Sequence, residues 1–226
     1  MRMLLQFAKG DTVRHLGLLD LQRTMQRALR RSGLPLRYSS GFNPHIVMTF
    51  ASALSTGIPG DAELLDVSLS GETSEEECLA RMNRVLPPTL RASRVRLVED
   101  SFPKASAALA QAEYCIRLRG GDAGKIADAL SGFLAQEEIM ALRKTKRQET
   151  LVNIRPMIHR LTSAQEGEEV VLTARVSFVE AATLKPDLLM ESLCAYAGAQ
   201  LPRCDIRRTG LFGIARDGSA VSLIDL

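Results

Sequence analysis

The sequence predicts an α+β protein built from two ferredoxin-like β-α-β-β-α-β units in tandem. Three observations lead to this fold class. The order strand, helix, strand, strand, helix, strand can be followed twice along the chain. The 226 residues suffice for two units of about a hundred residues, each with its own core. An alanine-rich stretch containing Pro103 forms a natural connector over residues 101–111. We therefore expect units at 1–100 and 111–226.

The duplication rests on element order alone, because the two halves share negligible sequence identity. A single larger α+β domain is the structural alternative.

The first half contains clear helix and strand signals. A helix that follows the polar turn 9–12 should end at Gly33, and Pro35 prevents its continuation. A second helix should begin at Thr73 as the N-cap, with Glu76 completing a capping box, and end before Pro87. Apolar or alternating runs predict strands at 2–7, 36–38, 46–50, 64–69 and 92–98.

The second half repeats this order. Helices are expected after Gly120-Gly121-Asp122 and from Lys185-Pro186-Asp187 onward. Strands are expected at 114–118, 151–158, 170–178 and 206–212.

Composition is that of an ordinary globular protein, with 46% apolar residues, 24% charged residues and a net charge of +3. No apolar run approaches the roughly 18 residues of a membrane-spanning helix, and the N-terminus turns polar too early for a secretory signal. We expect a cytoplasmic protein without membrane association. The four cysteines lack the spacing of zinc or iron–sulfur sites, so free thiols are expected.

A cluster of arginines is the most informative feature for function. Residues 14–37 contain six arginines and one acid, Asp20. Four of the arginines share one side of the predicted helix: Arg23, Arg27, Arg30 and Arg31. The opposite side carries Leu18, Leu21, Met25, Ala28 and Leu29. Each guanidinium can donate two parallel hydrogen bonds to a phosphate or carboxylate. This arginine stripe, with Arg37 beyond it, predicts an anion-binding surface; the alternative is a solvated face that keeps the protein soluble.

The segment 39–45 is an unusual turn that combines a glycine, an aromatic ring, a proline and several hydrogen-bonding side chains. Such a turn can present Phe42 for stacking on a base while Asn43 and His45 contact polar base edges. The alternative is a turn fixed by its Asn-Pro pair, with Phe42 buried in the core.

A second basic segment supplies four positive charges in five residues: Arg143, Lys144, Lys146 and Arg147. Arg155 follows. Sequence-independent phosphate contacts need little more than this, although a solvated loop has the same composition.

Other polar residues offer weaker signals. Asp61, Glu63 and Asp66 could hold a metal or act as acid and base, but carboxylates at a turn and strand start also serve solubility. The histidines are isolated and no serine-nucleophile motif is present. We predict no metal site, and His45 is the catalytic candidate if there is one.

Several sequence blocks resemble the radical SAM-linked (radical SAM-associated) family, a bacterial group of unknown function. The blocks are LDLQR (19–23), RALRRSGLP (27–35), YSSGFNPH (38–45) and TFA (49–51), continued by Gly57, Glu63, Asp66, NIRP (153–156) and LKPD (184–187). The similarity covers nearly the whole chain. Three positions depart from the pattern: Leu18 replaces a histidine, Ile46 a proline and Asn153 an aspartate. The losses of the histidine and the aspartate argue against acid–base roles at those two positions.

The resemblance implies an accessory to a B12-binding radical SAM protein, beside which members of the family are encoded or behind which they are fused. Members often lie near ribonuclease and ribosomal-protein genes. The cluster, SAM and B12 sites would then belong to another polypeptide, so the resemblance implies no intrinsic cofactor in this chain. Our first hypothesis is a non-catalytic RNA-binding module that presents a substrate to this partner. The alternatives are an RNA-processing or RNA-modifying enzyme that uses His45, and a protein adaptor whose arginine stripe docks the radical SAM subunit.

Overall fold

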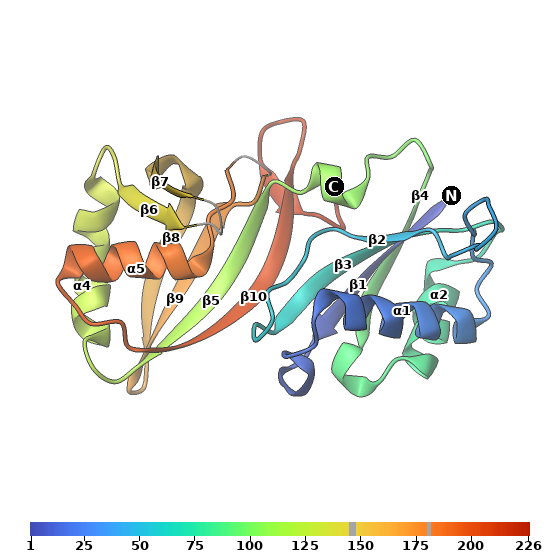
Figure 1. Ribbon diagram of the computed structural model, residues 1–226, viewed down its shortest axis with the longest axis horizontal. Coiled ribbons are helices and arrows are strands. Elements are labelled where there is room, and N and C mark those ends of the chain that lie inside the picture. The colour runs from blue at the N-terminus through green and yellow to red at the C-terminus, as the bar shows by residue number, and fades with distance from the viewer. Residues whose placement is uncertain (145–147, 180–181) are drawn as a thin grey trace. The chain divides into compact units, whose positions relative to one another are not determined.

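The computed structural model describes residues 1–144, 148–179 and 182–226 and confirms the α+β class. The chain forms two compact units (Figure 1). Unit 1 comprises Met1–Leu109 and Arg208–Leu226, and unit 2 comprises Ala110–Arg207. The first segment of unit 1 ends within the expected 101–111 connector. Residues 208–226, which we assigned to the second unit, lie in unit 1.

Unit 1 follows the β-α-β-β-α-β order. Its strands are β1 (Arg2–Lys9), β2 (Met48–Phe50), β3 (Gly60–Ser68) and β4 (Ala92–Val98), and its helices are α1 (Leu18–Ser32), α2 (Glu75–Val85) and the short α3 (Ala105–Ala108). The strand order is β4-β1-β3-β2, with antiparallel neighbours, as the ferredoxin-like interpretation requires. The C-terminal part of β10 (Arg203–Ile214) runs parallel to β3 at Gly60 and pairs with β11 (Ala220–Ser222).

One face of this sheet carries the main core of unit 1. Alternate residues of β1, namely Met3, Leu5 and Phe7, are fully buried and belong to the same cluster as apolar residues of α1 and α2. Figure 1 shows both helices on one side of the strands. The period of two on the strand and the apolar stripe on each helix account for this packing.

The other face of the unit 1 sheet is covered by two segments distant in sequence. Arg2 donates hydrogen bonds to Asp66 and to the carbonyls of Phe102 and Pro103. The C-terminal segment is held by Arg94, whose guanidinium contacts both carboxylate oxygens of Asp225 at 3.0 and 2.5 Å. This face is therefore closed by residues that the element order did not predict to lie there.

Unit 2 has a three-stranded antiparallel sheet in the order β8-β9-β5, which the N-terminal part of β10 extends. Its elements are β5 (Gln111–Arg119), α4 (Ala123–Ala135), β6 (Met140–Lys144), β7 (Glu149–Asn153), β8 (Ile158–Glu166), β9 (Glu169–Ser177) and α5 (Pro186–Ala197). Strands β6 and β7 form a separate two-stranded sheet.

Three sequence predictions of local structure are wrong. The strand expected at 36–38 is reduced to isolated bridges of Leu36 with Leu69 and of Tyr38 with Ile46. A single strand was expected over 151–158, but β7 ends at Asn153 and a 3-10 turn at Arg155–Met157 precedes β8. Pro156 breaks the strand because it has no N–H to donate to a ladder. The N-cap of α2 is Ser74 rather than Thr73: the Ser74 side chain accepts a hydrogen bond from the backbone N–H of Glu77 at 3.1 Å.

The structure holds no disulfide, since all four cysteines are free. In the described ranges, no three His, Cys, Asp or Glu side chains are grouped so as to hold a metal ion. No helix of those ranges has both the length and the hydropathy needed to cross a membrane.

Candidate nucleic-acid interface

Helix α1 places the arginine stripe at the surface of unit 1. Its buried residues are Leu21, Met25, Ala28, Leu29 and Ser32. The opposite side exposes all four stripe residues: Arg23, Arg27, Arg30 and Arg31. Leu18, which was expected on the apolar face, is 40% exposed because the helix meets the core only from Leu21 onward. Gly33 ends the helix at φ +70, a left-handed conformation that glycine adopts without strain.

The stripe guanidiniums are held only weakly by the protein. Arg23 lies 3.4 Å from Asp20, and both side chains are more than half exposed. Arg27 donates to the Thr24 hydroxyl at 3.2 Å, and Arg31 donates to the Val85 carbonyl at 3.2 Å. An exposed ion pair such as Arg23–Asp20 contributes about 0–1 kcal/mol, and the other two contacts are exposed hydrogen bonds to uncharged groups. An incoming phosphate can therefore replace all three. Among the described residues, one loosely held carboxylate, that of Asp20, thus lies beside the four guanidiniums.

The turn 39–45 is closed at its base by Ser39 and His45. The Ser39 N–H donates to the His45 carbonyl at 2.8 Å, and the His45 N–H donates to the Ser39 hydroxyl oxygen at 3.1 Å. The same hydroxyl lies 2.8 Å from Nδ1 of the imidazole. These contacts orient the His45 ring and leave its Nε2 for another partner.

The apex of the turn projects into solvent. Phe42 is fully exposed, with a relative accessibility of 106%, so the alternative of a core-filling ring is wrong. Asn43 and His45 are also exposed. Gly41 has φ +117, which only glycine tolerates well and which allows the chain to turn before Phe42. An exposed aromatic ring flanked by polar side chains is suited to stacking on an unpaired base.

Arg37 has a closer carboxylate partner than any residue of the stripe. It donates to Asp100 at 3.0 Å, and the N-terminal ammonium of Met1 lies 3.1 Å from the same carboxylate. The two cations lower the pKa of Asp100, chiefly through their hydrogen bonds. Arg37 is exposed but is the least available of the predicted arginines in unit 1.

The basic residues of the second predicted segment serve mainly to connect elements of unit 2. Arg143 is half-buried and donates to the Thr183 carbonyl at 2.9 Å. Arg155 donates through Nε to the Leu134 carbonyl at 3.0 Å. Lys144 is exposed and lies 3.4 Å from Glu149. Lys146 and Arg147 lie outside the described residues.

Asn153, at the position where the family pattern has aspartate, has a structural role. Its Oδ1 accepts hydrogen bonds from the N–H groups of Ile139 and Arg155, both at 3.0 Å. A carboxylate oxygen could accept the same two bonds. The substitution therefore preserves the contacts that start the 3-10 turn after β7.

The acids Glu63 and Asp66 are buried in ion pairs rather than arranged as an acid–base site. Glu63 pairs with Arg208, and Asp66 pairs with Arg2 at 2.7 Å. Lys9 is also buried, and desolvation lowers its pKa. Sequence reasoning missed Arg2, Lys9 and Arg208. Acids inside an apolar strand signal a buried cation, but nothing local identifies which one.

The other histidines give no sign of a catalytic site. His15 is exposed and its Nε2 accepts from Arg14 at 3.2 Å. His159 contacts the Ser177 hydroxyl at 2.8 Å, and burial, reinforced by Arg175, lowers its pKa. No carboxylate is recorded beside either ring in the described part of the chain.

Comparison with solved structures shows the fold alone. A chain of the crystal structure of a Cbf5-Nop10-Gar1 complex is 12% identical with a TM-score of 0.50 over 92% of this chain and 48% of that chain. This chain thus spans about half the length of that one. An unknown protein from Galdieria sulphuraria is 14% identical over 92% and 97% of the two chains, with a TM-score of 0.29.

Comparison with sequences identifies a family. No curated protein matches the chain. The model of a family described as "Uncharacterized protein conserved in bacteria (DUF2344)" matches residues 2–186, which include the stripe, the turn, the buried acids and the Asn153 element. This protein therefore belongs to the DUF2344 family of uncharacterized bacterial proteins.

Proposed function

We propose that this protein is an accessory RNA-binding module that presents a structured RNA to a partner radical SAM enzyme. The observation that carries the proposal is the arginine stripe. In the described part of the chain, its four exposed guanidiniums have one carboxylate beside them, that of Asp20 at 3.4 Å from Arg23. A face kept charged only for solubility would be equally well served by lysine and glutamate in balance. Planar guanidiniums that outnumber their neighbouring acids match phosphate groups.

The length of the stripe fits several phosphates. Arg23 and Arg31 are eight residues apart, which is about 12 Å along a helix. Because α1 packs on the core through its other side, the row is a rigid surface. Because the helix is already ordered, binding does not cost the free energy of ordering it.

The turn 39–45 presents an aromatic ring, which a surface that binds phosphates alone does not need. Phe42 is fully exposed, and the turn beneath it is closed by the Ser39–His45 hydrogen bonds. Stacking on an unpaired base explains why an apolar ring is exposed at this position. We therefore expect a preference for RNA with a single-stranded loop over a continuous duplex.

The proposed partner rests on sequence resemblance. Residues 14–66 carry the blocks that resemble the radical SAM-linked family, and α1 and the turn lie within them. In this proposal the partner supplies the SAM chemistry and this chain binds the RNA substrate. In unit 2, Arg143 and Arg155 are half-buried and bound to backbone carbonyls, which leads us to assign the RNA surface to unit 1.

A filter-binding experiment tests the RNA surface. The probe is a labelled RNA hairpin with an unpaired loop, and the variant is Arg27→Gln/Arg30→Gln/Arg31→Gln. The matched control, Arg91→Gln/Arg160→Gln/Arg216→Gln, removes the same charge at exposed arginines elsewhere. The stripe variant should bind at least tenfold more weakly than the control. Equal affinities would refute the proposal.

Co-purification with the radical SAM protein after nuclease treatment tests the partner. Retention of the complex without RNA supports a direct contact, whereas separation by nuclease would contradict it. If the stripe variant keeps its RNA affinity but loses the partner, the stripe docks protein and not RNA.

The contact between Ser39 and His45 favours one second candidate, an RNA-processing enzyme. A hydroxyl 2.8 Å from Nδ1 orients the ring and leaves Nε2 for proton transfer. His45→Gln should then abolish RNA turnover while preserving RNA affinity. Absence of turnover by the wild-type protein, with or without its partner, would exclude this candidate.

A further inference from the structure

Helix α2 lies beside α1, and two side-chain contacts show how the helices are aligned. Arg81 of α2 donates a hydrogen bond to the Gly33 carbonyl, at the end of α1, at 2.6 Å. Arg31, earlier on α1, donates to the carbonyl of Val85, later on α2, at 3.2 Å. Residue numbers therefore rise along α2 as they fall along α1, so the two helices are antiparallel. The last turn of α2 lies level with Arg31, at the C-terminal end of the arginine stripe.

This last turn of α2 carries an exposed arginine, Arg84. A helix of 3.6 residues per turn places Arg84 about 60° around α2 from Arg81, which contacts α1. The same geometry places it about 140° from the middle of the buried side, which contains Cys78 and Met82. The Arg84 side chain therefore leaves α2 toward solvent, next to the side of the helix that contacts α1.

Arg84 has no counter-charge. The helical positions three and four residues away, from which an acid could pair with it, are Ala80, Arg81, Pro87 and Pro88. Within residues 1–144, 148–179 and 182–226, no hydrogen bond or ion pair involves the Arg84 guanidinium. Arg81 differs, because its guanidinium contacts the Glu77 carboxylate at 2.5 Å as well as the Gly33 carbonyl. Arg81 thus connects the helices, whereas Arg84 is available to a ligand.

Arg31 also retains free donors. Its Nη2 contacts the Val85 carbonyl, which leaves most of the five N–H groups of the guanidinium for a ligand. Neighbouring Cα atoms are about 3.8 Å apart, so the Arg84 side chain starts one residue from the carbonyl that Arg31 contacts. Asp20 is eleven residues from Arg31, roughly 16 Å along the helix. Two exposed guanidiniums, one from each helix, can therefore converge at the end of the stripe that is distant from its acid.

We propose that Arg84 is a further RNA-binding residue, which holds one backbone phosphate together with Arg31. This inference rests on the proposed function, because its ligand is the RNA assigned to the stripe. A backbone phosphate has two non-bridging oxygens, and guanidiniums from two helices can each donate hydrogen bonds to it. Such a contact positions the RNA without reading its sequence. The RNA surface then extends from α1 onto α2.

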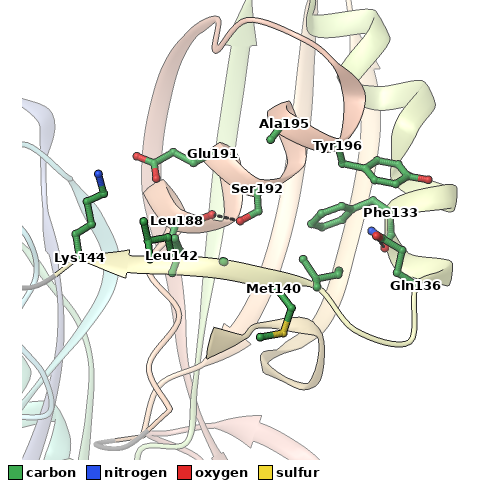
Figure 2. Close-up of a pocket in the computed structure, with 12 residues that line it drawn as sticks. Phe133, Gln136, Met140, Leu142, Lys144, Leu188, Glu191, Ser192, Ala195 and Tyr196 are labelled. Carbon is green, nitrogen blue, oxygen red and sulfur yellow. Dashed lines mark hydrogen bonds between the residues drawn. The ribbon is translucent and has the colours of Figure 1, made fainter. Parts of the chain in front are cut away.

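Filter binding with the labelled RNA hairpin tests Arg84. Arg84→Gln should weaken binding at least threefold, and by the same factor for a continuous duplex, because a phosphate contact needs no unpaired base. One control is Arg216→Gln, at an exposed arginine of unit 1 between β10 and β11. The other is Lys144→Gln, at a lysine that lines a groove between β6 and α5 of unit 2 (Figure 2). Both controls should bind within about 1.5-fold of the wild type. An Arg84→Gln affinity equal to theirs would overturn the proposal.

A double-mutant cycle tests whether one phosphate is shared. If it is, the loss in Arg31→Gln/Arg84→Gln should be at least twofold smaller than the product of the two single losses, because either change already breaks the joint contact. Arg23→Gln/Arg84→Gln provides the comparison and should give the full product, since Arg23 lies about 12 Å from Arg31 along α1. Full products in both cycles would contradict a shared phosphate.

The inference and the proposed function fail by different results. If the triple stripe variant binds weakly while Arg84→Gln binds like the wild type, the inference alone is wrong. If the triple stripe variant binds as tightly as its control, the proposed function is wrong and the inference falls with it. Thermal unfolding is measured alongside. A lower midpoint in Arg84→Gln with unchanged RNA affinity would show that Arg84 acts on the α2 dipole instead, and would overturn the inference.

Discussion

Arg208 and Glu63 form a buried, two-point ion pair although 145 residues separate them in the sequence. The Arg208 Nε and Nη2 atoms donate to the two carboxylate oxygens at 2.8 and 2.5 Å, and the residues are 1% and 3% exposed. The pair fastens β10 to β3. The Lys9 ammonium interacts electrostatically with Glu63 and Arg208. It donates hydrogen bonds to the carbonyls of Arg14 and Leu16, both at 2.9 Å. This cluster thereby fixes the loop that leads into α1 and its arginine stripe.

The Arg208–Glu63 pair gives a prediction about stability. Glu63→Gln should lower the free energy of unfolding by about 3–5 kcal/mol, because it leaves a buried guanidinium without its counter-charge. Replacing both residues, as in Glu63→Leu/Arg208→Leu, should cost less than the single change. Urea denaturation of the three proteins measures this order. A single variant as stable as the wild type would show that the pair is not buried in solution.

Asn153 gives a second prediction. Asn153→Ala removes the acceptor of two backbone N–H groups and should destabilise unit 2 by about 1–3 kcal/mol. Asn153→Asp keeps an acceptor oxygen in the same place and should lie close to the wild type. Thermal unfolding distinguishes the two. If the aspartate variant were as unstable as the alanine variant, the structural explanation of this position would be wrong.

Phe42 should matter for RNA and not for folding. Because the ring is fully exposed, Phe42→Ala should change the free energy of unfolding by less than about 0.5 kcal/mol. Loss of one stacked base should weaken binding of a hairpin RNA by about 1–3 kcal/mol, while Phe42→Trp should retain affinity. A continuous RNA duplex provides the comparison. An equal loss of affinity for hairpin and duplex would contradict base stacking.

The C-terminal contact gives a prediction about pH. Its hydrogen bonds with Arg94 lower the pKa of Asp225. A carboxyl whose folded pKa lies below its unfolded value of about 3.9 stabilises the fold above that value, and the contribution disappears as pH falls through the folded pKa. A carbonyl-carbon NMR titration should find the Asp225 midpoint below the usual range. The midpoint should rise in Arg94→Gln, and an unchanged midpoint would show that the contact is absent.

Local sequence signals predicted much of the fold. The strand at 2–7, the helix ended by Gly33, the break at Pro87 and the helix opened by Pro186 all correspond to observed elements. They are set by near neighbours through apolar periodicity, capping and proline geometry. The exposure of the stripe was also predictable, because the apolar residues of α1 define its buried side.

The missed features depend on residues far apart in the chain. From the local sequence, Glu63 and Asp66 resemble surface acids. In the structure, β10 and β1 bring buried arginines to them. The roles of Arg143 and Arg155 depend on carbonyls in other segments. The β6–β7 hairpin was missed because β6 is short and ends in the charged pair Arg143-Lys144, which resembles a loop. No local pattern encodes these contacts.

The salt dependence of RNA binding tests the central claim most directly. For single-stranded RNA, the slope of log K against log salt is about −0.7 for each phosphate contact made by a cation. Removing three stripe arginines in Arg27→Gln/Arg30→Gln/Arg31→Gln should make the slope shallower by about 2, whereas Arg91→Gln/Arg160→Gln/Arg216→Gln should leave it within about 0.5 of the wild type. The same slope for all three proteins would contradict the claim that α1 binds the phosphates of RNA.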